Sequence, residues 1–419
     1  MTLPRHVGVS LTSSLERGQR VFVAGLSSES ALLREELMQN PEKAADVEFT
    51  CVQLPGIDST DYLAFHPESR TRAFFMTPSV REGMRRSRTL LHPLDYSGIA
   101  SHLWAADPFD CAIGQFTPPD RNGWCHPGMS VDFLPLVWKR AKRRIGHLNP
   151  RLPRIASSFR VHISELDVAV ERDAPLLTVS NPEPTAAAQL IAALAANLIL
   201  DGDTLQFGIG SVMPALAQAL SSHRSLRIHS GMVSSFVETM WRSGSLSPDE
   251  LIVAGVVFGD EAFYKSAGVL ERLKLEDVRT THGLGTVSAI ERFVAINGAV
   301  EVDLFGQTNS ERSDGSLMAG AGGLPAFAQA TQLSHDSQFL ICLPSTARNG
   351  KVSRIVPSLG AHGLCTVPRH LAGTIITEYG VAKLRDLSME ERAGALISIA
   401  HPDHRPSLST AWEVIRRKL

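Results

Sequence analysis

The chain has 419 residues, a length that suits two domains of ordinary size better than one compact core. Hydrophobic residues make up 43% and charged residues 20%, which excludes a disordered chain. The 41 basic and 43 acidic residues give a formal net charge of -2, so the basic excess of a nucleic-acid binder is absent. We interpret the one basic run, residues 139–144, as the solvated face of a helix.

Cysteine usage and hydropathy narrow the class of protein further. The chain has five cysteines at scattered positions and no CxxC pair, which predicts neither a disulfide framework nor a zinc site and suits a reducing compartment. The N-terminus lacks a signal-peptide pattern. The longest apolar run, residues 186–200, is shorter than the ~20 residues that span a bilayer. We therefore expect a cytoplasmic protein with no membrane segment and no metal ion.

Short apolar runs alternate with longer helical patterns along the chain. Five of these runs, rich in β-branched residues, are residues 21–24, 251–257, 293–296, 339–343 and 374–377. Short continuous apolar runs separated by helices predict parallel sheets covered on both faces. The expected fold class is α/β, with open sheets rather than a sandwich or a helix bundle.

A proline-rich stretch, residues 173–184, predicts a domain boundary just before a new helix. We place the two domains at residues 1–180 and 181–419. Each half runs from a strand into glycine, in residues 20–28 (RVFVAGLSS) and again in residues 204–211 (TLQFGIGS). This similarity predicts two related open α/β domains.

The first loop that could bind a ligand follows a predicted strand in residues 205–211 (LQFGIGS). Gly208 and Gly210 can bring bare backbone N–H groups close to an anion, and the helix start that follows adds its positive dipole. Met213 stands where a dinucleotide fingerprint needs its third glycine, and no GK[ST] follows. On this motif alone, a tight strand–helix turn without a ligand is the better interpretation.

A second glycine cluster comprises Gly320, Gly322 and Gly323. Such a loop can aim N–H groups at a developing oxyanion, although a plain turn is the simpler alternative. Basic residues follow in residues 344–357, where Arg348 and its neighbours could hold the phosphates of a nucleotide-like ligand. A solvated loop explains these residues equally simply.

Three histidine positions suggest chemistry. His401 and His404 have metal-like spacing, but Pro402 disturbs a helix and no third ligand is near, so we prefer a surface turn. His229 follows a strand-like run and is expected to be a hydrogen-bonded core residue. His282 lies among small flexible residues in 280–285 (TTHGLG). This is a better place for a reactive imidazole than that of the other two.

Several segments resemble the acetyl-CoA hydrolase/CoA-transferase family, which includes 4-hydroxybutyrate and acetate CoA-transferases. The matching segments are residues 202–220, 301–311, 320–330, 344–357, 366–369 and 375–405, and more weakly 118–124, 146–154 and 163–167. The SRIVP, TEYG and AHPDHR blocks are the most specific. The resemblance implies two α/β domains with the active site in the cleft between them. It also implies an acyl-CoA and a small carboxylate as substrates, with coenzyme A as substrate rather than resident cofactor. We expect a homo-oligomer, with a dimer favoured.

The resemblance also implies roles for individual residues. The family's transferases use a glutamate that forms an acyl-glutamyl anhydride and then a glutamyl-CoA thioester. By position, Gly323 matches the oxyanion-loop glycine, Glu378 a second glutamate, and Arg348 a basic residue that faces CoA. The nucleophile motif His-Thr-Glu-Met reads His-Ser-Gly-Met at residues 229–232, so Gly231 replaces the glutamate. The nearest acid, Glu238, lies seven residues further on.

His282 aligns with a family asparagine, so one carboxylate is lost and one imidazole gained. Three hypotheses follow. The first is CoA transfer, the family's usual activity, which we take as the expected function. The second is acyl-CoA hydrolysis, in which Gly231 leaves space for a water and His282 together with Glu378 acts as general base. The third is an inactive homologue that only binds acyl-CoA.

Overall fold

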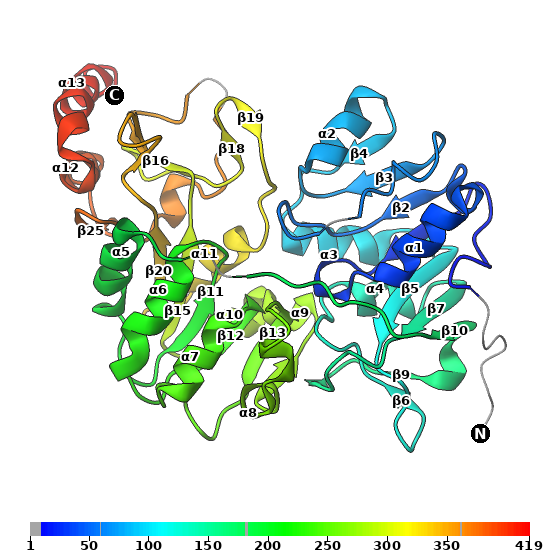
Figure 1. Cartoon of the computed structure of the whole chain (residues 1–419). Helices are drawn as coiled ribbons and strands as arrows, with labels where there is room; N and C mark the ends of the chain where they lie inside the picture. Colours follow the sequence, from blue (N-terminus) through cyan, green and yellow to red (C-terminus); the bar gives the residue numbers. More distant parts are fainter. Residues whose placement is uncertain (1–9, 59, 181–182, 361–362) are drawn as a thin grey trace.

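The computed structural model of the chain describes residues 10–58, 60–180, 183–360 and 363–419. Two α/β domains lie side by side, each built around a mainly parallel sheet with helices packed on it (Figure 1). The predicted fold class is therefore confirmed. Of the predicted boundary, residues 181–182 lie outside the described residues.

The N-terminal domain contains a seven-stranded sheet in which every pairing is parallel, in the order β10-β7-β5-β1-β2-β3-β4. Its strands are β1 Arg20–Val23, β2 Glu48–Thr50, β3 Arg70–Ala73, β4 Thr89–Leu91, β5 Cys111–Phe116, β7 Arg143–Leu148 and β10 Val168–Glu171. Its helices are α1 Ala31–Gln39, α2 Pro78–Arg85, α3 Tyr96–Ala105 and α4 Leu134–Trp138. All six residues of β5 are buried, because helices cover both faces of a parallel sheet.

The C-terminal domain contains a nine-stranded sheet in the order β25-β24-β20-β15-β11-β12-β13-β14-β8, parallel except for β25. Its strands are β8 Ala156–Ser157, β11 Thr204–Phe207, β12 Arg227–Val233, β13 Ile252–Val257, β14 Leu273–Leu275, β15 Phe293–Gly298, β20 Gln338–Cys342, β24 Thr374–Thr377 and β25 Gly380–Lys383. Its helices are α5 Ala186–Ala196, α6 Val212–Ala219, α7 Phe236–Arg242, α8 Ala267–Leu270, α9 Val278–Thr281, α10 Leu284–Ser288, α11 Leu324–Gln332, α12 Met389–Ile399 and α13 Arg405–Arg416.

Short strands form small additional sheets beside these two. They are β6 Trp124–Cys125 with β9 Val161–His162, β16 Glu301–Asp303 with β17 Thr308–Asn309 and β23 Ile355–Val356, β18 Arg312–Ser313 with β19 Ser316–Leu317, and β21 Thr346–Ala347 with β22 Val352–Ser353.

The two main sheets share one strand order. Read from one edge, the first is β4-β3-β2-β1-β5-β7-β10 and the second is β14-β13-β12-β11-β15-β20-β24. In each, the first strand is central, the next three lie on one side and the later three on the other. This repeated topology supports the predicted relationship between the halves. It also creates a point in each sheet where the strand order reverses, and ligands of open α/β sheets bind at such points.

The N-terminal half also contributes backbone to the second sheet. Strand β8 pairs in parallel with β14 at its edge, through Ala156 and Lys274. A nearby loop pairs Ser130 with Val256 in an isolated bridge, and Val131 N donates to Gly255 O at 3.0 Å. The sheets therefore do not divide at a single residue: β8 belongs to the second sheet, whereas β10, later in the chain, belongs to the first.

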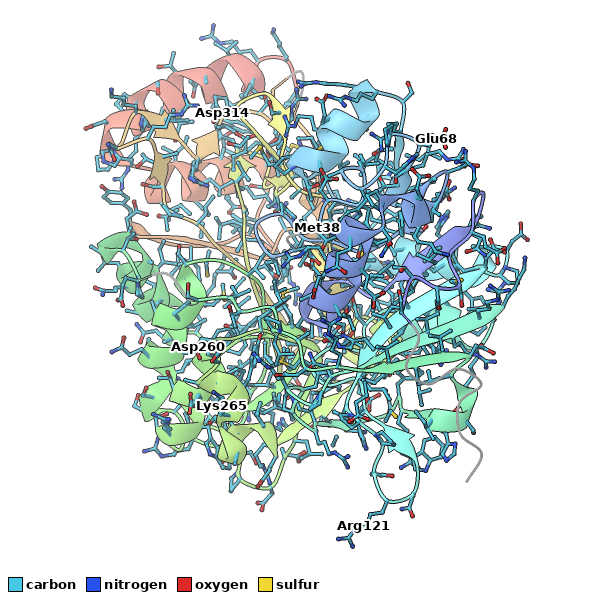
Figure 2. The ribbon with its side chains drawn as sticks, turned by 45° about the vertical axis from the view of Figure 1, so that its right-hand side comes forward. Met38, Glu68, Arg121, Asp260, Lys265 and Asp314 are labelled. Carbon is cyan, nitrogen blue, oxygen red and sulfur yellow. The ribbon has the colours of Figure 1, made fainter. Side chains whose placement is uncertain are left out.

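The basic run at residues 139–144 is not a helix face, which corrects our interpretation. Helix α4 ends at Trp138, and Arg143 and Arg144 begin strand β7. Strand pairing with β5 overrides the local pattern here, because residues 145–148 are apolar enough to enter the sheet interior. Figure 2 shows charged side chains such as Glu68 and Lys265 at the periphery. Within the described ranges, no helix is long and apolar enough to cross a membrane.

Candidate active site

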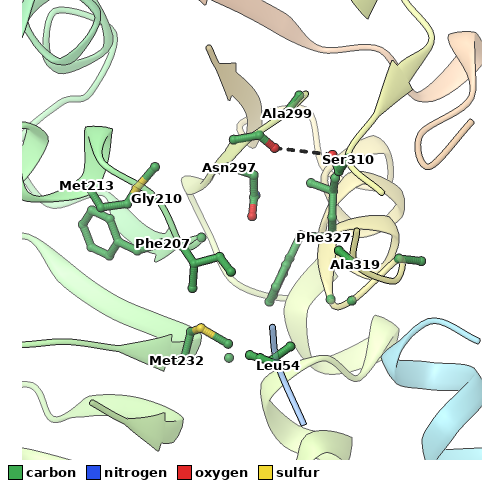
Figure 3. A pocket seen from close by; sticks show the side chains of 18 of the residues that line it. Leu54, Phe207, Gly210, Met213, Met232, Asn297, Ala299, Ser310, Ala319 and Phe327 are labelled. Atoms are coloured by element: carbon green, nitrogen blue, oxygen red, sulfur yellow. Dashed lines mark hydrogen bonds between the residues drawn. The ribbon is translucent and has the colours of Figure 1, made fainter. Parts of the chain in front are cut away.

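A cavity of about 400 Å³ lies between the two domains (Figure 3). Leu54, Phe75 and Tyr96 reach it from the N-terminal domain, and the remaining wall is mostly C-terminal. It lies at the carboxyl ends of β11 and β15, the strands between which the order of the second sheet reverses. This is the position where the topology of an open α/β sheet favours ligand binding.

Local backbone geometry opens this end of the sheet. Strands β11 and β12 pair only at their first residues, from Thr204 to Leu205. Beyond that point the Ser230 hydroxyl bridges them: it accepts from Phe207 N at 3.2 Å and lies 2.7 Å from Met232 O. On the other side, Asn297 Nδ2 donates to Gln206 Oε1 at 2.8 Å, and both side chains line the cavity.

Most of the residues predicted for the site line this cavity, in agreement with a single ligand site. They are Gly208, Gly210, Gly231, His282, Gly320, Gly322 and Gly323. Glu378 and Arg348 are not in the lining. Sequence reasoning did not select Leu54, Phe75, Tyr96, Asn297 and Phe327, which also form the wall.

The second glycine loop is fixed against the N-terminal domain. Met76 N donates to Ala319 O at 3.2 Å, and Tyr96 N donates to Gly322 O at 3.0 Å. Gly322 has φ +63°, a left-handed conformation that glycine adopts without strain. Gly323 is the N-cap of α11, whose first N–H groups have no partner within the helix. The loop and helix start can therefore stabilise negative charge in the cavity.

The His282 ring fills the space between two of these glycines. It is 3% exposed and lies between the Tyr96 ring, 4.5 Å away, and the Phe327 ring, 4.8 Å away. A Cβ atom on Gly231 would lie 2.4 Å from Cε1 of His282, and one on Gly323 would lie 2.3 Å from Nε2. A side chain at either position would therefore force the His282 ring to shift.

This geometry corrects the expectation that Gly231 leaves space for a water molecule. The space beside its Cα is occupied by the imidazole, because His282 and Gly231 are in direct contact. His282 also lines the cavity, so a water or other nucleophile must approach the ring from the cavity side. The two departures from the family pattern are thus sterically coupled.

Hydrogen bonding sets the tautomer of His282. The Thr281 hydroxyl donates its single hydrogen to Asp277 O at 3.3 Å, the carbonyl one helical turn earlier. We assign the 2.9 Å contact between Thr281 Oγ1 and Nδ1 as an Nδ1–H donor to that oxygen, since the carbonyl of Asp277 can only accept. It follows that Nε2, between the two glycines, carries the free lone pair.

The imidazole is neutral over the whole physiological range. Burial, and secondarily the neighbouring His229, lower the pKa of His282 to about 3. Burial also lowers the pKa of His229, whose Nε2 is buried without a hydrogen-bond partner. Among the described residues that line the cavity there is no aspartate or glutamate. The lining therefore offers a neutral imidazole and backbone N–H groups, together with the hydroxyls of Ser211 and Ser310 and the thiol of Cys342, whose pKa burial raises.

The carboxylate of Glu378 is hydrogen-bonded to Ser345 and is not in the cavity lining. It accepts from Ser345 N at 2.8 Å and from Ser345 Oγ at 2.7 Å, at the end of β24. The ring of His282 is oriented by Thr281 instead. Glu238, the acid nearest in sequence to Gly231, lies in α7 and accepts from Arg242 and Ser266. Neither carboxylate lines the cavity.

The basic residue of the cavity wall is Arg354, not Arg348. Arg348 is 61% exposed and pairs with Asp314 at 2.6 Å, on the part of the surface where Figure 2 labels Asp314. Arg354 donates from Nη1 to Val300 O at 3.1 Å. Its Nε is buried without a partner, and it is the one charged side chain in the described lining.

The His401–His404 pair forms a short turn, as the sequence suggested. The turn is a single 3-10 segment, Pro402–His404, in which His404 Nε2 contacts Gly350 O at 2.9 Å. Throughout the described ranges, no three His, Cys, Asp or Glu side chains are grouped so that they could hold a metal ion.

Solved structures with this fold match along the whole chain. RipA from Yersinia pestis has a TM-score of 0.89 over 98% of both chains at 23% identity. A 4-hydroxybutyrate CoA-transferase from Porphyromonas gingivalis has a TM-score of 0.79 over 99% of this chain and 98% of its own, at 26% identity. The class defined by fold and site is thus the two-domain α/β fold of the CoA-transferases.

Sequence comparison then gives the family. The acetyl-CoA hydrolase/transferase N-terminal domain matches residues 10–179, and the corresponding C-terminal domain matches residues 259–412. The 4-hydroxybutyrate coenzyme A transferase of Clostridium kluyveri is 30% identical over 409 residues, 96% of this chain and 95% of its own length. The chain belongs to the acetyl-CoA hydrolase/transferase family, which confirms the resemblance seen in its motifs.

Proposed function

We propose that this chain hydrolyses acyl-CoA thioesters, with Nε2 of His282 taking the proton of the attacking water. One observation carries the proposal: the described cavity wall presents this imidazole and no carboxylate. Transfer through a glutamyl-CoA intermediate needs an enzyme carboxylate as nucleophile. Gly231 has no side chain to supply one, and Glu238 is bonded elsewhere.

Membership of the family supports an acyl-CoA as the ligand. The named relatives act on CoA thioesters, and the cavity wall offers features that suit such a ligand. The glycine loop and the start of α11 direct N–H groups at an anion, while Arg354 supplies one positive charge. CoA is a substrate in this proposal.

The reaction steps balance with the groups present. The water oxygen attacks the thioester carbonyl carbon while one water proton moves to Nε2 of His282. The carbonyl oxygen becomes an oxyanion, which N–H groups around Gly323 stabilise. The tetrahedral intermediate then expels the CoA sulfur, which takes the proton back from Nε2. The products are a carboxylic acid and the free thiol of CoA.

The low pKa of His282 has two opposite consequences for this role. A base whose conjugate acid has a pKa of about 3 is weaker than the ideal near neutrality. However, the imidazole is never lost to protonation at working pH. A negative oxyanion formed beside the ring stabilises the imidazolium, because an opposite charge nearby favours the charged form. The proton transfer is therefore coupled to formation of the intermediate.

CoA transfer to a small carboxylate is the second candidate, supported by the relative that matches nearly the full chain. In this cavity the acceptor carboxylate would attack the thioester in place of water and form a free mixed anhydride. The CoA thiolate would then attack the other carbonyl and release the original acid. No covalent enzyme–CoA species is formed on this route, which also agrees with the absence of a carboxylate in the described lining.

A thiol-release assay separates the candidate functions. Hydrolysis predicts free CoA from acyl-CoA in buffer alone, with no dependence on acetate. Direct transfer predicts a new acyl-CoA only when a carboxylate is added. Intact-mass spectrometry after incubation with acetyl-CoA should show no covalent CoA adduct. Tight binding without any turnover would leave the third hypothesis, an acyl-CoA-binding homologue, and would contradict the proposal.

A further inference from the structure

The end of the cavity around His282 is aromatic and uncharged. Tyr96 and Phe327 flank the imidazole, and Phe75 packs edge-on against Tyr96 with ring centroids 6.2 Å apart. The imidazole itself is neutral because burial holds its pKa low. No charged side chain of the described lining belongs to this end, so a ligand group bound here meets aromatic rings, the neutral imidazole and backbone.

Two apolar side chains from different domains close the same end. Leu54 comes from the loop after β2 and is 5% exposed, and Met232 follows Gly231 in β12. Figure 3 shows both on one side of the cavity, opposite Ala299 and Ser310. The two side chains therefore line one side of the cavity from the two domains, and Met232 follows the glycine that contacts the imidazole.

A buried carboxylate holds Leu54 in position. Asp58 Oδ2 accepts from Leu54 N at 2.6 Å, and Asp58 Oδ1 accepts from Leu26 N at 2.7 Å. The loop that carries Leu54 is thus bonded to the turn after β1, whose Leu26 has φ +58°. Asp58 thus ties the backbone N–H of Leu54 to that of Leu26 and fixes the loop that carries this part of the wall.

The cation of the cavity lies at the other end. Arg354 contacts the carbonyl oxygens of Ala299 and Val300, and Figure 3 places Ala299 across the cavity from Leu54. The polar arm of a CoA thioester suits the Arg354 end, and its acyl group then extends toward Leu54 and Met232. The reacting carbonyl lies between them, beside Nε2 of His282.

We propose that the acyl group of the substrate is uncharged and apolar, and that Leu54 and Met232 limit its length. The identity of the ligand as an acyl-CoA rests on the proposed function. A carboxylate at the far end of the acyl chain would lose its hydration with no partner to replace it, which is unfavourable. Each methylene group placed there is removed from water, which is favourable until the wall is reached.

The test compares kcat/KM for a series of acyl-CoA substrates. Butanoyl-CoA should exceed succinyl-CoA, its counterpart with a terminal carboxylate, by at least about 10-fold. In Leu54→Ala or Met232→Ala, the ratio of octanoyl-CoA to butanoyl-CoA should rise by about 10-fold or more, since one methylene in an apolar pocket is worth roughly that much. Leu54→Phe should lower the same ratio.

The ratio of two substrates also controls for loss of folded protein in a variant. A ratio of two substrates on one preparation does not depend on the folded fraction, so a destabilised variant remains informative. Met38→Ala is the matched control, because Met38 is exposed on α1 and outside the lining (labelled in Figure 2). Its ratio should stay at the wild-type value. A preference for succinyl-CoA, or ratios that ignore both Leu54 variants, would overturn the inference.

Binding measurements separate this inference from the proposed function. Calorimetry with the same thioesters gives an affinity order even if turnover is absent. If butanoyl-CoA binds more tightly than succinyl-CoA and Leu54→Ala changes that difference, but no thioester is hydrolysed, the proposed limit on the acyl group is supported and the proposed hydrolysis is contradicted. If all acyl-CoAs are hydrolysed and substitution of Leu54 has no effect on their order, the proposed hydrolysis is supported and the limit on the acyl group is contradicted.

Discussion

The imidazole of His282 lies where a side chain on Gly231 would begin, with Cε1 2.4 Å from that Cβ position. The side chain that residue 231 can carry therefore depends on the position of the His282 ring. A side chain at residue 231 is incompatible with the present position of the His282 ring in this backbone. The family's carboxylate chemistry is blocked here by the same ring that offers an alternative base.

This relationship predicts that Gly231→Ala is destabilising. An added Cβ overpacks a rigid site, which typically costs about 1–3 kcal/mol. The cost should largely disappear in a His282→Ala background, because the ring that the Cβ meets is gone. Denaturant unfolding of the two single variants and the double variant measures the coupling. Additive effects would contradict the steric pairing.

The same pairing predicts how a covalent intermediate could be restored. Gly231→Glu alone should show no CoA adduct, since His282 occupies the space of the new carboxylate. The double variant Gly231→Glu, His282→Ala should form a glutamyl-CoA species, detectable by intact mass after incubation with acetyl-CoA. An adduct at Glu238 in the unmodified chain would contradict the alignment of Gly231 with the family nucleophile.

The tautomer of His282 makes Thr281 a positioning residue. Thr281→Val removes the oxygen that accepts from Nδ1, so the proton is free to move to Nε2 and the lone pair leaves the cavity. Loss of one buried hydrogen bond of ~1–3 kcal/mol corresponds to roughly a 10- to 100-fold lower rate. Thr281→Ser keeps the hydroxyl and should restore most of the activity.

A merely structural role for Thr281 would be distinguishable from this one. Nitrogen-15 shifts of the His282 ring report which nitrogen is protonated, and Thr281→Val should change that assignment while Thr281→Ser should not. Thr280→Val is a neighbouring control outside the cavity lining. If Thr281→Val lowers stability but leaves the tautomer and kcat unchanged, the positioning role is wrong.

Much of the scaffold could be predicted from local sequence. Residues 374–377 coincide with β24, and residues 293–296 lie within β15, because apolar runs buried on both faces leave few alternatives to a central strand. The glycine loops were located for the same local reason, although a turn without a ligand was the better or simpler interpretation of each. Gly320 has no room for a Cβ, which would lie 2.6 Å from Phe74 O. Such backbone constraints are visible in a single sequence.

Residues that act through tertiary placement were not predictable. Leu54 and Tyr96 carry no motif and reach the cavity only because one domain packs on the other. The choice between Arg348 and Arg354 depends on a hairpin. Strands β21 and β22 pair antiparallel, so Arg348 lies at the turn with φ +52° while Arg354 lies past the base, beside β23. No spacing rule distinguishes two arginines six residues apart in a loop.

The pKa of His282 predicts an unusual dependence of activity on pH. A histidine base with an ordinary pKa loses activity as pH falls through 6.5. Because burial lowers the pKa of His282 to about 3, kcat/KM should be flat from pH 8 to pH 5 where the protein remains folded. A profile measured with fixed ionic strength checks this. An acid limb with a midpoint near 6.5 that vanishes in His282→Ala would contradict it.

The same pKa has the opposite sign for stability. Between pH 6.5 and pH 3 the unfolded chain binds a proton on residue 282 that the folded chain does not, so the free energy of unfolding decreases as pH falls through this window. From pH 7 to pH 5 this one residue accounts for about 2 kcal/mol. Asp58, whose pKa burial raises to about 7, acts in the opposite direction between pH 4 and pH 7.

Comparison with His282→Asn isolates the histidine from Asp58, because Asp58 is common to both proteins. The variant should lose less stability than the wild type on acidification from pH 7 to pH 5. Urea unfolding at each pH gives the two differences. An equal decrease in the free energy of unfolding in both proteins would show that His282 titrates normally in the folded state. The interpretation of His282 as a buried neutral base would then be wrong.

Arg354 and Arg348 provide the last prediction, which concerns CoA affinity. Arg354 lines the cavity, has no carboxylate partner among the described residues and buries an unpaired Nε, so a ligand oxygen that pairs with its guanidinium gains a charge-assisted hydrogen bond. Arg354→Ala should weaken CoA binding by ~1–3 kcal/mol, measured by calorimetry. Arg348→Ala breaks an exposed pair with Asp314, which is worth only about 0–1 kcal/mol, and should change CoA affinity little.

Titration with pantetheine, which lacks all CoA phosphates, shows which part of the ligand Arg354 contacts. If Arg354→Ala weakens pantetheine binding as much as CoA binding, Arg354 contacts the pantetheine arm; if it does not weaken pantetheine binding, Arg354 contacts a phosphate. The reverse order, in which Arg348→Ala weakens binding and Arg354→Ala does not, would place the CoA arm along the surface hairpin instead of in the cavity.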